Sequence, residues 1–164
     1  MEIQKNIASV ESPLLAEYIL EKHGPMSHLK LQKLLYLVEG YHLAYYGVSL
    51  IEDDFEAWTH GPVSRKIFDL LKDKSRIYAD LRFVAEQGQP LPSQRMAQTL
   101  TLDQLELIDE VLNIYDAESG LELEALTHSQ DPWINARGGI PMFEKCTNVI
   151  SKENMKAYFR KFVN

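Results

Sequence analysis

Residues 27 to 46 constrain the fold most, because their apolar side chains occupy two opposite faces of one predicted helix. At 100° per residue, one face carries Leu31, Leu34, Leu35, Val38, His42 and Tyr45, and the opposite face carries Leu29, Tyr36, Gly40, Leu43 and Ala44. Ser27 suits an N-cap and Gly47 suits a C-terminal stop. A helix that is apolar on two opposed sides must be covered on both. We therefore expect this helix at the centre of the fold, wrapped by other elements.

Helical spacing recurs through most of the remaining chain. Further helices are predicted from Ser12-Pro13 to His23, from near Val63, from the capping box at Thr101, from Ser119 or Gly120 to His128, from Asp131 to Arg137, and from Ser151 onward. Short strands are candidates at 50–58, 76–84 and 143–150, and residues 87–98 are expected to be an irregular connection. The fold class is therefore mainly α. We expect one compact helical domain over residues 1–164, with residues 1–11 as a loose leader.

The length and the cysteine usage indicate an ordinary cytoplasmic domain. A chain of 164 residues fits one domain and can bury roughly two thirds of its unfolded surface. The single Cys146 cannot form an internal disulfide, which suits a reducing compartment. The first twenty residues lack a secretion-signal pattern, and no run approaches the roughly 18 apolar residues of a membrane span. We expect no membrane partner.

The formal net charge of −7 disfavours nucleic acid as a partner. Sequence-independent nucleic-acid binding depends on Lys and Arg side chains that neutralise phosphates, and this chain is acidic. An acidic surface instead favours encounters with basic proteins. A nucleic-acid-binding repressor therefore stays an alternative with little support from composition.

Three histidines, His42, His60 and His128, are the best candidates for metal or acid–base chemistry. Their spacing matches no recognised ligand or catalytic motif, so we expect no cofactor, no metal and no enzymatic activity. His42 lies on an apolar helix face and is expected to be a buried, hydrogen-bonded core residue. His60 and His128 can each bond a backbone carbonyl and so fix a loop.

The segment from Glu52 to Pro62 is the first candidate for partner binding. The acidic run Glu52, Asp53 and Asp54 leads into a loop that contains Trp58, His60, Gly61 and Pro62. In a structural interpretation, Trp58 fills the core, Gly61 permits a turn and Pro62 opens the next helix. In a functional one, the aromatic and acidic side chains contact a partner protein, because aromatic anchors dominate interface energies. Both roles can coexist.

The segment from Thr127 to Arg137 is the second candidate. It brings Thr127 and His128 at the end of one predicted helix close to Trp133 and Arg137 in the next. Trp133 can pack against the central helix, or the loop can form the edge of a groove that receives a partner.

The blocks KLQKLLY (30–36), GYHL (40–43), EAW (56–58) and GPV (61–63) occur in one order, followed by LTH (126–128), PW (132–133) and AR (136–137). This arrangement resembles the Panacea domain, a family of SocA-like bacterial proteins associated with phages and mobile elements. The resemblance implies an antitoxin or adaptor that binds a toxin protein encoded beside it. For SocA-like members it further implies delivery of the toxin to a Clp protease.

Together the residues and the resemblance favour a non-enzymatic module that binds a cognate toxin, with homo-oligomerisation left open. The alternatives are a hydrolase or metal-binding enzyme that uses His60 or His128, and a structural protein of a phage or mobile element.

Overall fold

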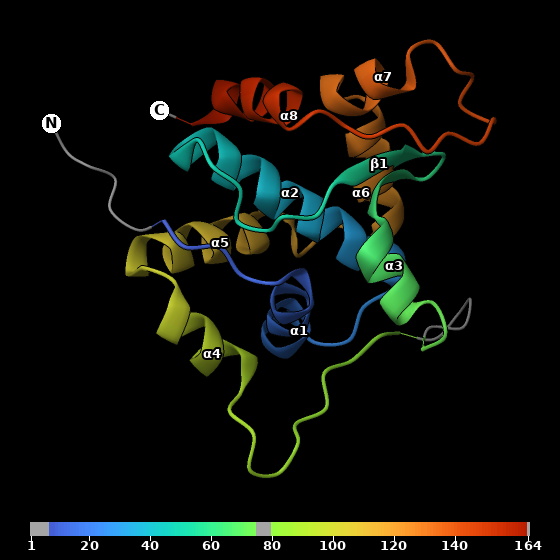
Figure 1. The fold of residues 1–164 in the computed structure, drawn as a ribbon. Helices are drawn as coiled ribbons and strands as arrows, with labels where there is room; N and C mark the ends of the chain where they lie inside the picture. Colours follow the sequence, from blue (N-terminus) through green and yellow to red (C-terminus); the bar gives the residue numbers. More distant parts are fainter. Residues whose placement is uncertain (1–6, 75–79, 164) are drawn as a thin grey trace, which may run out of the picture.

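The computed structural model describes residues 7–74 and 80–163 of the chain. Within them the fold is mainly helical, as predicted, with one small antiparallel sheet of two strands (Figure 1). The elements are α1 (Ser12–His23), α2 (His28–Tyr46), β1 (Phe55–Trp58), β2 (Gly61–Ser64), α3 (Arg65–Leu71), α4 (Pro92–Thr99), α5 (Leu102–Tyr115), α6 (Gly120–His128), α7 (Asp131–Arg137), α8 (Lys152–Phe159) and a 3-10 turn, η1 (Arg160–Phe162). In that part of the chain, no helix combines the length and apolar character needed to cross a membrane.

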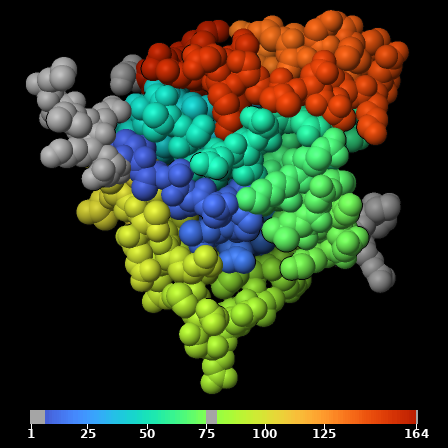
Figure 2. Space-filling view, in the orientation of Figure 1, coloured from blue at the N-terminus to red at the C-terminus, as the bar shows by residue number. Residues whose placement is uncertain are grey.

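Helix α2 lies at the centre, which confirms the main prediction from the sequence. Every residue from 31 to 40 is buried, and α1, α5, α6, α8 and β2 all pack on this helix. Ser27 caps its start by accepting the Lys30 N–H at 3.1 Å, and Gly47 ends it with a left-handed φ of 78°. Figure 2 shows the blue and cyan segments between the C-terminal elements in orange and red and the α4 region in yellow.

Gly40 explains how closely α8 approaches α2. A Cβ atom at Gly40 would lie 2.3 Å from the ring of Phe159, so only glycine leaves room for that ring. The Phe159 ring also packs against Tyr36 and Tyr41, with centroid separations of 5.7 Å and 5.0 Å. These contacts fix the C-terminal helix against the middle of the central one.

The β1–β2 hairpin corrects the predicted start of the third helix. Pro62 and Val63 belong to β2, paired with Ala57 and Glu56, and α3 begins at Arg65. The prediction that Pro62 opens the helix was therefore wrong. Gln32 on α2 explains the extended backbone, because its side-chain amide bonds both the N–H and the C=O of Ser64, at 2.9 Å and 3.1 Å.

The other predicted strands are shorter than expected. Residues 55–58 of the 50–58 candidate form β1. In the 143–150 candidate, the Asn148 carbonyl accepts the Ala57 N–H at 2.8 Å, and the Ile150 N–H donates to the Phe55 carbonyl at 2.7 Å. Between them, Val149 forms an isolated β-bridge with Glu56. In the 76–84 candidate, residues 76–79 lie outside the described part, and Leu81 forms an isolated bridge with Met26.

The expectation of an irregular connection over 87–98 was wrong for its second half. Helix α4 begins at Pro92, whose fixed φ and missing N–H suit a first helical turn. The Gln94 side chain accepts the Leu91 N–H at 2.8 Å, and Met96 is buried. Pro92 followed two residues later by Gln94 is the sequence signal from which the start of α4 could have been predicted.

The chain around residues 8–10 is held in place. The Val10 N–H donates to the Leu50 carbonyl at 2.9 Å, and the Gln104 side chain donates to the Ala8 carbonyl at 2.8 Å. This differs from the loose leader expected over 1–11, of which residues 1–6 lie outside the described part.

Candidate protein-binding site

Side chains from α2, α6 and α7 bond the backbone of the β1–β2 hairpin. Each donor bonds a different carbonyl oxygen, and together the four contacts cover both strands and the connecting turn. We call this set the hairpin clamp: Arg137 to Ala57 at 2.9 Å, Trp133 to Trp58 at 2.8 Å, His128 to Thr59 at 2.9 Å, and Lys33 to Pro62 at 3.0 Å. Carbonyl groups near a turn lack the full ladder of partners that a wider sheet supplies, so these bonds fix its shape.

Lys33 is the most unusual member of the clamp, because its side chain is fully buried within α2. Burial lowers the pKa of its ammonium group to about 7, and the nearby Glu124 carboxylate opposes that shift. A buried Lys with a pKa near neutrality readily exists as a neutral amine, which can still donate to the Pro62 carbonyl. Sequence reasoning missed Lys33, although a Lys inside a two-faced apolar helix was the available signal.

Gly61 shapes the turn that the clamp holds. Its φ is +100°, and an added Cβ would lie 2.6 Å from the Lys33 Cε and 2.8 Å from the Thr127 hydroxyl oxygen. The residue therefore has to be glycine for both backbone and packing reasons. Thr127 is buried, and its hydroxyl donates to the Glu124 carbonyl at 2.9 Å.

The two loop histidines have different roles. His128 bonds the Thr59 carbonyl, which confirms the prediction that it fixes a loop, and burial lowers its pKa. Its ring also packs on Trp133, with centroids 4.3 Å apart. His60 instead pairs with the Glu124 carboxylate, and its side chain is 76% exposed. The prediction that His60 bonds a carbonyl was wrong, because the turn directs its ring towards solvent.

Trp58 lies half-buried on the hairpin surface and does not fill the core, which corrects the structural interpretation of that residue. Its indole N–H donates to Glu56 at 2.9 Å, and the Arg65 guanidinium lies 5.2 Å from the ring centroid. Arg65 also binds Glu56 through two nitrogens, at 2.8 Å and 2.9 Å, and this contact lowers the Glu56 pKa. The indole is thus held in one orientation and remains partly exposed.

The acidic run lies at the other end of β1 from the turn. Glu52 and Asp54 are exposed, whereas Asp53 accepts the Ser64 hydroxyl at 2.6 Å. Glu52 and Asp53 also line a hollow of about 300 Å³, together with Lys66 and Arg95. The structure therefore does not bring the acids together with Trp58 and His60.

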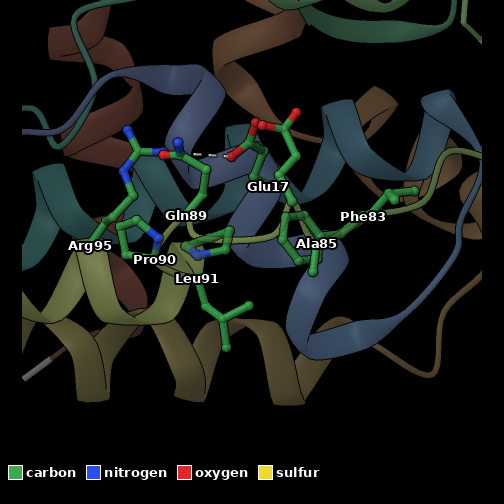
Figure 3. Close-up of a pocket in the computed structure, with 10 residues that line it drawn as sticks. Glu17, Phe83, Ala85, Gln89, Pro90, Leu91 and Arg95 are labelled. Carbon is green, nitrogen blue, oxygen red and sulfur yellow. Dashed lines mark ion pairs between the residues drawn. The ribbon is translucent and has the colours of Figure 1, made fainter.

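A second hollow, of about 140 Å³, contains none of the residues predicted for the site (Figure 3). Glu17 and Arg95 cross it as an ion pair at 3.8 Å. The remaining lining comes mainly from Phe83, Gln89, Pro90 and Leu91.

His42 is a core residue, as predicted. It is buried, its Nδ1 lies 2.8 Å from the Val48 carbonyl oxygen, and its Nε2 lies 3.0 Å from the Gln104 amide. Burial lowers its pKa to about 4, so the ring is neutral near pH 7. Among residues 7–74 and 80–163, no three His, Cys, Asp or Glu side chains are arranged to hold a metal ion.

The candidate residues of the second segment thus face inward. Trp133 and Arg137 are 5% and 2% exposed, so they act on the hairpin backbone in this conformation. Of the first segment, Gly61 and Pro62 are also buried, while His60, Glu52 and Asp54 are exposed. The second segment and the hairpin part of the first, which the sequence predicts separately, form one unit, and the acidic run lies apart from it.

Comparison with known proteins places this unit in a family. A family model described as "Antitoxin SocA-like, Panacea domain" matches residues 31–134, which include the hairpin and three of the four clamp donors. That span is more than half of the chain. The chain belongs to this family. The resemblance inferred from the sequence blocks of the Panacea domain is therefore confirmed.

The curated relative Antitoxin SocA of Caulobacter vibrioides (strain NA1000 / CB15N) is 39% identical over 64 residues. The alignment covers 37% of this chain and 34% of that protein, so it spans about a third of the relative's length. No solved structure matches this Panacea domain at a significant level.

Proposed function

We propose that this Panacea domain is an antitoxin that neutralises a cognate protein toxin by binding it, without chemical conversion. Membership in the SocA-like antitoxin family supports a toxin as the partner. The observation that carries the binding mechanism is the hairpin clamp. Its buried donors, Lys33 and Trp133, bond backbone carbonyls, and His128 also bonds a carbonyl. These groups stabilise a displayed turn, and none is a free nucleophile at an open site.

The surface offered to the toxin includes the exposed part of the hairpin. His60 is exposed at the turn, and the partly exposed Trp58 indole is held by Glu56 and Arg65 at the end of β1. A turn fixed by its backbone loses little conformational entropy on association, which favours tight binding. The exposed carboxylates of Glu52 and Asp54 add attraction for a basic partner.

We propose that neutralisation is steric, so that binding alone covers the working surface of the toxin. Delivery of the bound toxin to a Clp protease is a second role for the same complex, and it predicts a shorter toxin half-life. Measuring the toxin half-life with and without this chain, in cells with and without the protease, separates the two roles.

The test of the proposed function is co-expression with the product of the adjacent reading frame. We expect that product alone to arrest growth and this chain to restore growth. A variant that disturbs the hairpin should fail to restore growth, while a variant with a neutral change elsewhere should succeed. Growth arrest that this chain does not relieve would contradict the proposal.

A further inference from the structure

The connection between α7 and α8 contains a tight turn at residues 141–144. The Glu144 N–H donates to the Pro141 carbonyl at 3.0 Å, which closes the turn and leaves Met142 and Phe143 as its central residues. In Figure 1 this orange connection extends along the edge of the molecule, beside the hairpin. The Thr59 hydroxyl reaches across to the Glu144 carbonyl at 3.4 Å.

Arg137 fixes this turn to the hairpin clamp. Its Nη2 donates to the carbonyls of Pro141 and Glu144, both at 2.7 Å, and its Nη1 donates to Ala57 in β1. The guanidinium thus joins both ends of the turn to the first strand, and it packs 4.9 Å from the Trp133 ring centroid. The planar, permanently charged guanidinium presents its N–H donors in a rigid fork, which suits it to hold several carbonyls in a fixed arrangement.

The side chain that this turn presents is a phenyl ring in solvent. Phe143 is 93% exposed and neighbouring Met142 is 48% exposed. Phe side chains are usually buried in folded domains, because removing the ring from water is favourable. An aromatic ring left outside on a backbone that a buried cation holds in place is the arrangement expected of an interface anchor.

We propose that Phe143 inserts into an apolar pocket on the cognate toxin, with Met142 packing at the pocket's rim. The inference rests on the proposed function, since it names how the same partner is held. The toxin is the occupant because the turn is continuous with the proposed binding surface, through Arg137 and through Thr59. Phe143 lies outside the matched family segment, which ends at residue 134.

The experiment compares three purified chains, wild type, Phe143→Ala and Leu102→Ala, in binding to the product of the adjacent reading frame. Leu102 is the matched control because its side chain is 79% exposed and lies at the start of α5, outside the hairpin clamp and the turn. We expect Phe143→Ala to weaken binding by about tenfold or more, the usual effect of removing an anchor, and Leu102→Ala to bind like wild type. Phe143→Leu should restore most of the affinity, because the pocket requires an apolar side chain.

Two outcomes would overturn the inference: Phe143→Ala that binds as tightly as wild type, or a loss of the same size in Leu102→Ala. Thermal unfolding of each variant shows that any loss concerns binding, because an exposed ring contributes little to the fold. If wild type binds and restores growth while Phe143→Ala does so equally, only this inference fails. If wild type does not bind the toxin, the proposed function itself fails.

Discussion

The ammonium nitrogen of Lys33 lies 3.0 Å from the carbonyl oxygen of Pro62, and the whole Lys33 side chain is buried. This contact links the central helix to the only β-hairpin in the described part of the chain. It also places a titratable group in an apolar environment, directly behind the proposed binding surface. The stability of that surface should therefore depend on pH.

Lys33→Met is expected to flatten the dependence of stability on pH above neutrality. Burial lowers the folded-state pKa of Lys33 to about 7, below its ordinary value of 10.5. Between these values the unfolded chain binds a proton that the folded chain lacks, so stability rises with pH, by up to about 1.4 kcal/mol per pH unit. Urea unfolding at pH 7.5 and 9 should show this rise in wild type and a smaller one in the variant. Equal slopes would show that Lys33 titrates normally.

Gly61→Ala is expected to destabilise the fold by about 2–4 kcal/mol, since the added Cβ meets Lys33 and Thr127 at a φ of +100°. Gly88→Ala is the matched control. Gly88 also has a positive φ, +81°, but its added Cβ would meet nothing within 4 Å. Chemical denaturation should show a clearly larger loss at position 61. Similar losses at both positions would mean that backbone strain alone sets the cost.

Glu52→Ala with Asp54→Ala is expected to slow association with a basic toxin a few-fold at low salt, with little change in melting temperature. Asp53 is left in place because it accepts the Ser64 hydroxyl, and that same hydroxyl oxygen caps α3 by accepting the Ile67 N–H at 3.2 Å. Stopped-flow association rates at several salt concentrations provide the measurement. An unchanged rate would remove the acidic run from the interface.

Gly40→Ala is expected to displace α8, because the new methyl group would overlap the Phe159 ring at 2.3 Å. Overpacking of this kind typically costs about 1–3 kcal/mol. The substitution should increase the amide hydrogen-exchange rates of α8 more than those of α5, relative to wild type. Combining Gly40→Ala with Phe159→Leu should cost less than the sum of the two single changes, and strict additivity would argue against direct contact.

The sequence predicted the helical framework because its signals are local. The cap at Ser27, the stop at Gly47 and the capping box at Thr101 were all confirmed. Strand β2 was not predicted, because Gly61–Ser64 shows no alternating pattern and its extended form depends on Gln32 and Lys33, some thirty residues earlier. Local patterns carry no information about such distant partners.

The sequence predicted many residues of the candidate site, but it predicted only part of their arrangement in space. Trp133 and His128 were considered either core or interface, and the structure shows both bonded to the hairpin backbone. Neither the burial of Lys33 nor the exposure of Phe143 follows from residue type, because each depends on contacts made across the fold. The turn held by Arg137 therefore became visible only in three dimensions.

Titration calorimetry of this chain with the purified product of the adjacent reading frame, followed by intact-mass analysis of both proteins, tests the central claim most directly. Binding without conversion predicts a stoichiometric complex in which both masses are unchanged. A toxin whose mass is altered by a small fraction of an equivalent of this chain would contradict the account, because that result requires catalysis.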